Sequence, residues 1–558
     1  MNSGPRWLLI VAIILLGLGE MGWVAYRAVV RVQAEMHAAM LPHPVNRVPL
    51  KGLPRHLFTR VEANTFLDRA KKAEAIADPL KRCLAYPDPP GSHWSADAVS
   101  AYCHYRFQHV ITFDQVQKLI QEGKAAEVDR RFAEILQAQL TEPAARGRLD
   151  RAFYQDFNNG SFAIRSTLDA WKRDSPKSVF AWAASGYAYV QMAVDARGAQ
   201  YMRDTPQSNI DAMDKLLAQA DTDLRHALAL DPRLTPVYTA MITAGGFGLG
   251  NEYARDAAKR GLAVAPDNSD IREQLIWLDE PKWYGSLAEM RAQAQQAQAH
   301  AKANPLLRML LTNEPFYRVE NCDCAKLTQV AEFPAALDQL AGSGQLLIAG
   351  NAAHGVNHPA SVIYLSEALR FNPGLDDARI NRVHELVEFD ELSWAVTEAS
   401  HMIAALPHDE DPLKARAHAY DIQGDFVRAE QDYRAAVKLV PGDFESWARL
   451  GNLYVYQSHD WDKGWAVADK LIKAHPENPY GWMLRADIQA QAPRPGLKDT
   501  VAYFDAHFGN RNPQLHGIAV RMHAALVLEN HSGAKVLASQ GKSTSREAAA
   551  RKTAVPTQ

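Results

Sequence analysis

Residues 417–454 read AHAYDIQGDFVRAEQDYRAAVKLVPGDFESWARLGNLY, and this stretch decides the fold. A turn at Gly424 and Asp425 separates two segments whose apolar residues have helical spacing, and Pro441 ends the second segment. Glycine tolerates the left-handed backbone of a short turn, aspartate caps a following helix, and proline stops a helix. The stretch therefore predicts two helices joined by a tight turn, followed by the first helix of another such pair.

Prolines repeat this unit along the chain at a nearly constant spacing. The spacings are 34, 34 and 35 residues in one series and 34 residues in an earlier pair. The prolines are Pro373, Pro407, Pro441 and Pro476, with Pro232 and Pro266 upstream. A fixed period near 34 residues, with small and apolar residues in phase, is typical of stacked helical pairs rather than of a globular enzyme core.

Small and large residues recur where two packed helices need them. In two adjacent repeats these residues are Tyr420, Ala429, Tyr433, Ala436, Trp447, Leu450, Gly451 and Tyr454. They resemble the tetratricopeptide repeat (TPR) family. The resemblance implies an all-α, tetratricopeptide-like solenoid whose first helices line an inner surface that binds a protein or peptide.

Two irregularities interrupt the series upstream. After a first helix near Trp182, the second helix arrives about 22 residues late, and five extra residues precede Pro305. The stretch 185–297 resembles an uncharacterised bacterial family, domain of unknown function 4034, which is marked by Ala-Arg-Gly and by Pro-Lys-Trp-Gly-Gly-Ser. Here the markers are Ala196-Arg197-Gly198 and residues 281–286, with Tyr284 in place of the first glycine. The resemblance implies a bacterial protein and supplies no activity.

The composition favours a helical protein and argues against nucleic-acid binding. Hydrophobic residues make up 47% and charged residues 22% of the 558 residues, without strand-like alternation. The 61 basic and 64 acidic side chains give a formal charge of -3. A chain with this balance lacks the basic surface that phosphate backbones attract, so we expect no nucleic-acid partner.

The segment 7–26, WLLIVAIILLGLGEMGWVAY, predicts one transmembrane helix. Its length of roughly 20 residues suits a bilayer, Glu20 lies near one end, and aromatic residues stand at the expected interfaces. The alternative is a cleaved signal peptide, which the long apolar run and the missing Ala-x-Ala site disfavour. We expect a single-pass anchor in the bacterial inner membrane.

The positive charges on the two sides of the predicted span are nearly equal, so they do not decide the membrane orientation. The cysteines give a second indication. Cys83 and Cys103 bracket the proline-rich segment 86–91, a spacing compatible with a disulfide in an oxidising compartment. Two buried free thiols are the alternative. The possible disulfide favours a periplasmic solenoid.

These features predict a domain organisation from anchor to tail. We expect a membrane anchor at 1–32, a linker at 33–60, a helical capping region at 61–175, irregular repeats with inserted loops at 176–305, TPR-like repeats at 306–499, a C-terminal helical cap at 500–531, and a disordered tail at 532–558.

Two motifs have the residue types of metal or redox sites. Cys322-Asp323-Cys324 places two thiols two residues apart, but no second pair supplies further ligands, so a loop disulfide or free thiols are favoured over zinc. His354 and His358 are four residues apart, yet Gly355 and Pro359 indicate that His358 lies in an interhelical turn. We therefore predict no metal and no cofactor.

A glycine-rich segment, 245–250, lacks the preceding strand and the Gly-Lys-Ser of a phosphate loop, so we interpret it as an interhelical turn. The inserted loops contain a possible ligand site formed by Arg197, Lys282, Trp283 and Ser286. A lysine and an aromatic ring suit an anionic or planar ligand; the alternative is that Trp283 only packs the loop onto the solenoid. If the loops converge on a pocket, an enzyme or small-ligand sensor is the alternative function.

The predicted partner surface is formed by first-helix residues that alternate with packing positions. These are Lys414, His418, Glu445, Asn452, Tyr456 and Asp487. The carboxylate clamp of chaperone-binding repeats is absent, because His418 replaces its asparagine and the third repeat offers Tyr480 and Leu484. A solvated surface without a partner is the alternative. With no catalytic motif, we expect a membrane-anchored scaffold in the bacterial cell envelope that binds a protein or peptide and is not an enzyme.

Overall fold

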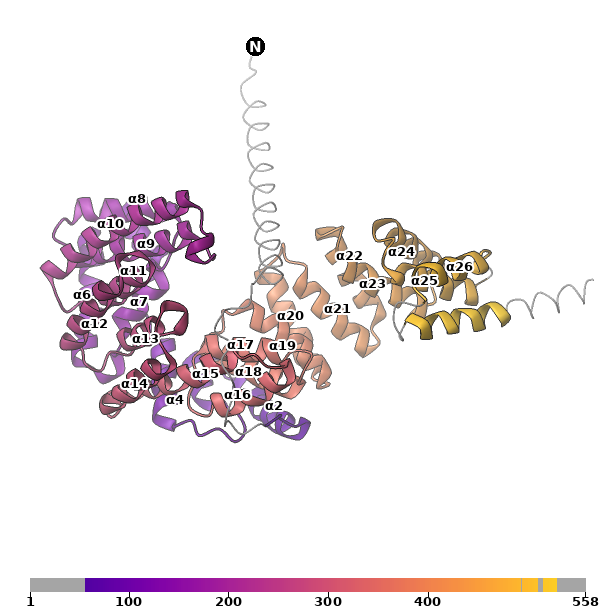
Figure 1. Cartoon of the computed structure of the whole chain (residues 1–558), viewed down its shortest axis with the longest axis horizontal. Coiled ribbons are helices and arrows are strands. Elements are labelled where there is room, and N and C mark those ends of the chain that lie inside the picture. The colour runs from indigo at the N-terminus through magenta and orange to yellow at the C-terminus, as the bar shows by residue number, and fades with distance from the viewer. Residues whose placement is uncertain (1–55, 493, 510–514, 529–558) are drawn as a thin grey trace, which may run out of the picture. The chain divides into compact units, whose positions relative to one another are not determined.

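The computed structural model describes residues 56–492, 494–509 and 515–528. Within these residues every regular element is a helix (Figure 1). No helix in this part of the chain is long and apolar enough to cross a bilayer. The predicted membrane span at 7–26 and the predicted tail at 532–558 lie outside the described residues.

The chain forms two compact units that are not consecutive in sequence. The first comprises His93–Leu340, and the second combines Leu57–Ser92 with the chain from Ala341 onward. The predicted boundaries at 175 and 305 divide the chain differently, since both fall inside the first unit. The two ends of the first unit meet: the His93 amide donates to the Asp338 carbonyl at 2.9 Å, and Trp94 Nε1 donates to the Leu337 carbonyl at 2.9 Å. The first unit is therefore an insertion into the second.

The first unit is a stack of helices around an aromatic core. Its α-helices are α4 (Ala96–Phe107), α5 (Phe113–Gln121), α6 (Ala125–Thr141), α7 (Arg148–Phe157), α8 (Arg165–Asp174), α9 (Val179–Arg197), α10 (Gln207–Leu230), α11 (Thr235–Ala244), α12 (Asn251–Val264), α13 (Ser269–Leu278), α14 (Leu287–Ala297), α15 (Asn313–Glu320) and α16 (Lys326–Ala336). Phe132 lies at the centre of the core, within 6 Å of the ring centroids of Phe153, Phe157 and Trp171.

The late second helix predicted after Trp182 is α10. The extra residues lengthen both helices of the pair, α9 to 19 and α10 to 24 residues, and leave a short connection between them. Gly186 lies where a Cβ atom would come within 2.6 Å of Leu224 Cγ, so the small residue lets the two helices approach. The insertion thus preserves the packing of the repeat.

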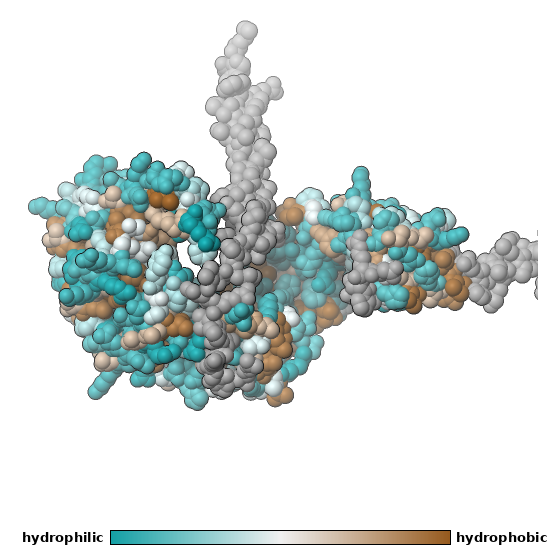
Figure 2. Space-filling view, viewed as in Figure 1, coloured by the Kyte–Doolittle hydropathy of each residue, from teal (hydrophilic) through white to brown (hydrophobic). Residues whose placement is uncertain are grey.

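The second unit contains the regular repeats. Its helices are α2 (Arg60–Glu74), α3 (Pro79–Ala85), α17 (Ser343–Ala353), α18 (His358–Phe371), α19 (Asp376–Glu388), α20 (Leu392–Ala405), α21 (Asp411–Gln423), α22 (Phe426–Leu439), α23 (Phe444–Asn452), α24 (Trp461–Ala474), α25 (Pro479–Gln491) and α26 (Leu497–His507). Residues 515–528 are also helical. On the face that Figure 2 shows, hydrophilic residues are interspersed with small apolar patches, as expected when most large apolar side chains are buried.

The predicted turn and packing positions are confirmed in this unit. Gly424 has a left-handed backbone with φ +77°, and the Asp425 side chain accepts a hydrogen bond from the Arg428 amide at 3.1 Å. At Gly451 a Cβ atom would come within 2.4 Å of Leu484. The extra residue between Pro441 and Pro476 lies in the stretch from the π-helical turn Leu453–Gln457 to the N-cap of α24. The architecture is a TPR-like helical repeat.

The loop prolines also act as hydrogen-bond acceptors. Trp447 Nε1 donates to the Pro441 carbonyl at 3.0 Å, six residues back, and the same six-residue contact recurs along the chain. The other side chains donate to the carbonyl of the proline six residues before them: Trp182 to Pro176, Tyr238 to Pro232, Arg272 to Pro266, Arg379 to Pro373 and Trp482 to Pro476. In these six repeats a side chain in the first turn of the first helix thereby ties that helix to the loop before it, whereas Leu413 at the same offset from Pro407 has no side-chain donor.

We expect Trp447→Phe to lower the free energy of unfolding by about 1 kcal/mol, because it removes one such hydrogen bond and leaves the Pro441 carbonyl with one partner fewer. Urea unfolding followed by far-ultraviolet circular dichroism measures the change. Trp461→Phe is the control, since Trp461 in the described structure has no hydrogen bond to a loop proline. Equal losses in the two variants would contradict the role of the contact.

Two buried arginines attach α2 and α3 to the repeat helices of the second unit. Arg370 on α18 is 4% exposed and donates to the Cys83 carbonyl at 2.9 Å and to Asp88 Oδ1 at 2.7 Å. Its neighbour Glu367 is fully buried, and burial raises the pKa of that carboxyl to about 8 although Arg370 opposes the shift. Arg370 therefore has most of its partners in the segment 57–92.

Arg382 on α19 forms the second attachment. It is 2% exposed, and its Nη1 lies 2.9 Å from Glu74 Oε1 at the end of α2, while Nε lies 3.1 Å from Glu398 Oε2 on α20. Burial opposes ionisation of Glu74, but the charge and hydrogen bond of Arg382 outweigh it and lower the pKa. The network stabilises the charged forms of Glu74 and Arg382.

Arg382→Met should destabilise the second unit by about 3–5 kcal/mol, because it leaves Glu398 and Glu74 without their buried counter-charge. Urea unfolding reports the loss, and hydrogen exchange of the α2 amides should accelerate. Arg434→Met is the matched control: Arg434 pairs with Glu430 at 3.4 Å with its side chain 62% exposed, so we expect a loss below about 0.5 kcal/mol. Unchanged exchange in α2 would count against the attachment.

Candidate partner-binding site

One helical stripe supplies the candidate site in the second unit. Counted from each loop proline, the residues at offsets 4, 7, 8 and 11 lie on the same face of the following first helix. Offset 11 is occupied in turn by His384, His418, Asn452 and Asp487 on α19, α21, α23 and α25. The repeat therefore lines up chemically related side chains from successive helices on one surface, which we call the first-helix face.

A pocket of about 180 Å³ opens on this face between α19, α21 and α23. It brings together three of the six predicted residues, Lys414, His418 and Glu445. The remaining lining residues are Ile380, Asn381, His384, Asp411, Tyr433 and Arg449. Apart from Tyr433 on α22, all lining residues belong to first helices.

The rim of the pocket carries two ion pairs of unequal strength. Lys414 Nζ lies 2.6 Å from Asp411 Oδ1, whereas Arg449 Nη2 lies 3.8 Å from Glu445 Oε1. Burial favours the neutral form of Lys414, but its hydrogen bond to Asp411 and the surrounding carboxylates outweigh burial and raise the pKa. Arg449 and Glu445 are half exposed and remain available to a ligand at the rim.

The floor of the pocket carries neutral polar groups. Burial lowers the pKa of His384 to about 4, with smaller contributions from the neighbouring His418, His354 and Arg449. Burial and Arg449 likewise lower the pKa of His418. The two imidazole rings are 6.1 Å apart and uncharged at neutral pH. A ligand group here meets two imidazoles and a phenol rather than a net charge.

Two polar atoms at this floor have no hydrogen-bond partner within the described protein. They are Nδ1 of His418 and the hydroxyl of Tyr433, both inaccessible to solvent. A buried polar group without a partner costs about 1–3 kcal/mol, which a hydrogen-bonding ligand group can recover. The pocket is thus suited to a polar group.

The other three predicted residues lie further along the same face and contact each other's helices. The Tyr456 hydroxyl donates to Asp487 Oδ2, and the Tyr480 hydroxyl donates to Asn452 Oδ1. Burial is the main cause that raises the pKa of Asp487. These side chains form a hydrogen-bonded extension of the first-helix face and do not line the pocket.

Six of the nine lining residues are not among the predicted site residues, although the repeat carries a signal for most of them. His384 lies 34 residues before His418, and Arg449 lies at offset 8 from Pro441 on the same face as the predicted Glu445 at offset 4, so the repeat itself points to both. Tyr433 was recognised only as a packing residue; it is indeed buried, and it also lines the pocket. The offsets 7, 8 and 11, counted from Pro373, give the three α19 residues Ile380, Asn381 and His384.

The inserted loops of the first unit meet on an aromatic cluster. Trp283 lies 5.1 Å from Phe247 and 4.8 Å from Trp277 between ring centroids, and Arg197 Cζ lies 5.5 Å from the Phe247 centroid. The three rings contact one another, so the cluster packs the two insertions together. Phe247 comes from the glycine-rich turn 245–250, where Gly246 allows the Trp277 ring to approach.

The remaining residues of the predicted ligand loop have structural contacts. Lys282 Nζ lies 2.6 Å from Glu280 Oε2, and the Ser286 hydroxyl caps α14 by accepting from the Glu289 amide at 3.2 Å. Tyr284 has φ +69° and is 96% exposed, while Gly285 approaches the Asp279 backbone too closely for any side chain. Ligand binding by Arg197, Lys282, Trp283 and Ser286 stays a prediction.

His354 and His358 share one carboxylate. The Nδ1 atom of His354 lies 2.6 Å from Glu385 Oε1, and that of His358 lies 2.8 Å from Oε2, with Glu385 fully buried. His358 was predicted to lie in an interhelical turn, but it is the first residue of α18, with Pro359 in the first turn of that helix. In the described residues no group of three or more His, Cys, Asp or Glu side chains could hold a metal ion. The two imidazoles therefore act as the hydrogen-bond partners of the buried Glu385 carboxyl group.

The cysteines occupy two different settings. Cys322 and Cys324 form a disulfide in the loop between α15 and α16. Cys83 lies on α3 and Cys103 on α4, and both are buried. The disulfide between Cys83 and Cys103 stays a prediction.

A buried carboxylate connects three helix starts of the first unit. Asp150 Oδ2 on α7 accepts from the Thr235 hydroxyl at 2.8 Å, from Asn268 at 3.1 Å and from Gln139 at 3.1 Å. Burial, with the nearby Asp270 adding, raises the pKa of Asp150 to about 7. Asp150 therefore ties helices together as a group that is partly protonated at neutral pH.

We expect the first unit to lose stability between about pH 4 and pH 7. The folded state keeps a proton on Asp150 that the unfolded chain releases near pH 4, so unfolding becomes easier by up to about 1.4 kcal/mol per pH unit. Asp150→Asn keeps an acceptor oxygen and should flatten this slope, as measured by urea unfolding at several pH values. The exposed Glu252→Gln should leave the slope unchanged, and an equally steep slope in Asp150→Asn would refute the assignment.

Comparisons with known proteins add little to this geometry. No family model matches the chain, and no curated protein matches it. The resemblance of 185–297 to the family of unknown function therefore stays a prediction.

Two solved structures share a helical arrangement at low similarity. Yeast Tom70 is 12% identical, with a TM-score of 0.33 over 87% of this chain and 98% of that chain. The TPR domain of P58(IPK) is 12% identical, with a TM-score of 0.21 over 72% of this chain and 99% of that chain. Both TM-scores lie below 0.5, so the architecture of this chain rests on its own helix packing.

Proposed function

We propose that the chain is a helical-repeat scaffold whose first-helix face binds a segment of a partner protein. The observation that carries the proposal is the pocket between α19, α21 and α23, in which the His418 and Tyr433 side chains present buried polar atoms without a protein partner. Stacked helices hold these groups in place before binding, so little ordering entropy opposes association.

An extended segment suits this face better than a compact small molecule. The first-helix face continues beyond the pocket through Asn452 at the end of α23 and Tyr456 in the following π-helical turn to Asp487 on α25, so polar groups recur in the next repeat. Both charge signs and several tyrosines are present, and tyrosine and arginine are enriched where proteins bind proteins. The pocket then receives one side chain of the segment.

The location proposed for this scaffold is the bacterial cell envelope. The disulfide between Cys322 and Cys324 supports an oxidising compartment, since cytosolic thiols are kept reduced. The apolar segment 7–26 would anchor the chain in the inner membrane with its repeats in the periplasm. Binding without catalysis is the proposed activity.

Site-directed photocrosslinking in intact cells tests the proposal. A benzophenone side chain at Glu445, whose side chain is 58% exposed at the pocket rim, should crosslink a protein partner. The same group at Val427 on α22, 69% exposed and outside the pocket, is the matched control. Equal crosslinking from both positions, or none from Glu445, would overturn the assignment of the face.

For the crosslinked partner, Arg449→Ala should weaken binding roughly 30-fold, about 2 kcal/mol, because arginines at such pockets are common binding hot spots. Isothermal titration calorimetry with the purified partner measures the change. Arg434→Ala, on the second helix α22, should change affinity less than twofold. A partner that binds both variants with wild-type affinity does not use the pocket.

A further inference from the structure

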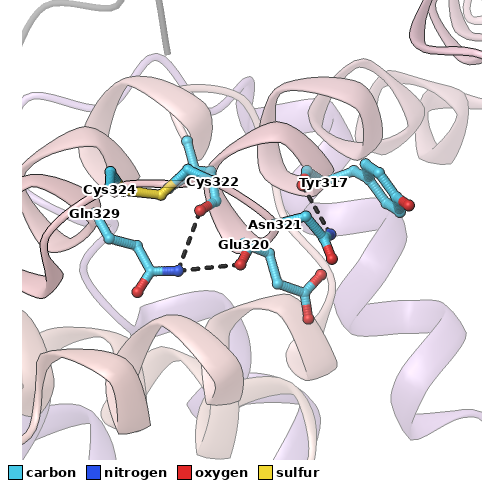
Figure 3. Close-up of a disulfide and its surroundings, with 7 residues drawn as sticks. Tyr317, Glu320, Asn321, Cys322, Cys324 and Gln329 are labelled. Carbon is cyan, nitrogen blue, oxygen red and sulfur yellow. Dashed lines mark hydrogen bonds between the residues drawn. A yellow bond between two sulfur atoms is a disulfide. The ribbon is translucent and has the colours of Figure 1, made fainter. Parts of the chain in front are cut away.

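The Cys322–Cys324 disulfide lies in a surface loop that is held in place without it. The loop connects α15 to α16, and both cysteines are half-buried. Gln329 Nε2 donates to the carbonyls of Val319 and Glu320, each at 3.1 Å, as Figure 3 shows beside the disulfide. The Asn321 side chain donates to the Tyr317 carbonyl at 2.9 Å. The end of α15 is thus linked to α16 by hydrogen bonds that do not involve the disulfide.

The disulfide closes too short a loop to contribute much to folding. The two cysteines are separated by two positions in the sequence. A disulfide stabilises mainly by removing entropy from the unfolded chain, and this effect grows with the length of the closed loop. A bond between residues so near each other is therefore more readily explained by its chemistry than by stability.

Cys324 is placed where a thiolate is stabilised. It precedes Ala325, the N-cap of the 11-residue helix α16, and alanine has no side chain that could cap the first amides. The first turn of α16 contains no acidic residue, and Lys326 occupies its first position. A helix N-terminus and a nearby cation both stabilise a thiolate, while the exposed Asp323 on the other side opposes them.

We propose that Cys322 and Cys324 form a redox-active pair that oxidises a dithiol of another protein by thiol–disulfide exchange. A thiolate of the partner attacks Cys322 Sγ, the bond between the two cysteine sulfurs breaks, and Cys324 leaves with the electron pair as a thiolate. The second thiolate of the partner then attacks the partner's first sulfur in the mixed disulfide, which closes the disulfide of the partner and releases Cys322 as a thiolate. Two electrons pass to this chain, and the two protons of the partner's thiols end on Cys322 and Cys324.

This direction of attack follows from the surroundings of the two sulfurs. The better leaving group in exchange is the thiol with the lower pKa, and the helix N-terminus and Lys326 favour Cys324 in that role. Cys322 follows α15, whose C-terminal carbonyls disfavour a thiolate. The activity is independent of the pocket on the second unit.

The full-length oxidised chain, incubated with a reduced peptide containing two cysteines, tests the proposal. We expect one peptide disulfide to form for each Cys322–Cys324 bond that opens, counted by alkylation and mass spectrometry. The urea unfolding midpoint of the opened chain should equal that of the closed chain. An inert disulfide, or one that opens only as the chain unfolds, would overturn the proposal.

Two variants separate redox chemistry from structure. In Cys324→Ser, Cys322 should form a mixed disulfide with added glutathione disulfide, which shows that its sulfur is accessible to exchange. Lys326→Glu should slow peptide oxidation about fivefold and raise the pKa of the Cys324 thiol in the reduced chain, followed by thiolate absorbance. Lys302→Glu, at an exposed position away from the loop, should do neither. Identical rates in the two lysine variants would rule out the assigned leaving group.

Discussion

The burial of Arg370 and Arg382 is the constraint on which the second unit depends. A guanidinium cannot lose its protons in a protein, so each arginine must find anions or carbonyls inside the fold. Glu74, Asp88 and the Cys83 carbonyl provide them from a segment nearly 300 residues away in the chain. Without α2 and α3, Glu367 and Glu398 would be the remaining carboxyl partners of Arg370 and of Arg382 Nη2, and the partners from the segment 57–92 would be lost. The segment 57–92 therefore acts as the N-terminal cap of the repeat array.

The repeats themselves could be predicted because their determinants are local. Gly424, Asp425 and Gly451 act through turns, caps and close helix packing within one or two repeats, and each has the predicted role. The assignment of α2 and α3 to the second unit could not be predicted in this way. It depends on hydrogen bonds between residues about 300 positions apart, which leave no periodic signal in the sequence.

Part of the candidate site could be predicted because its residues also follow the local repeat. Lys414, His418 and Glu445 lie in the pocket because the repeat period fixes which face of a first helix they occupy. Periodicity does not show how deeply a side chain is buried, so it gave no sign that Tyr433 on a second helix lines the pocket or that burial keeps His384 neutral. In the first unit, sequence could flag Trp283 but could not distinguish a ligand-binding ring from one that packs against Phe247 and Trp277.

The six-residue contacts to the loop prolines explain why the repeat keeps its period despite its insertions. Where the contact is present, a tryptophan, tyrosine or arginine fixes the start of the first helix relative to the preceding loop, independently of the length of the repeat before it. Extra residues, as in α9 and α10 or in the π-helical turn Leu453–Gln457, are then absorbed before the next proline.

The insertion of the first unit between α3 and α17 also fixes an order of events on the ribosome. Residues 93–340 must be synthesised after α2 and α3 and before Arg370 and Arg382 exist. At about 5–20 residues per second, this takes on the order of ten seconds to a minute. The first unit can close on itself in that time, because its two ends meet through His93 and Asp338. The helices α2 and α3 are thus made before the first unit but can dock only after it, and the nascent chain must keep their apolar surfaces from aggregating until the ribosome has reached α19.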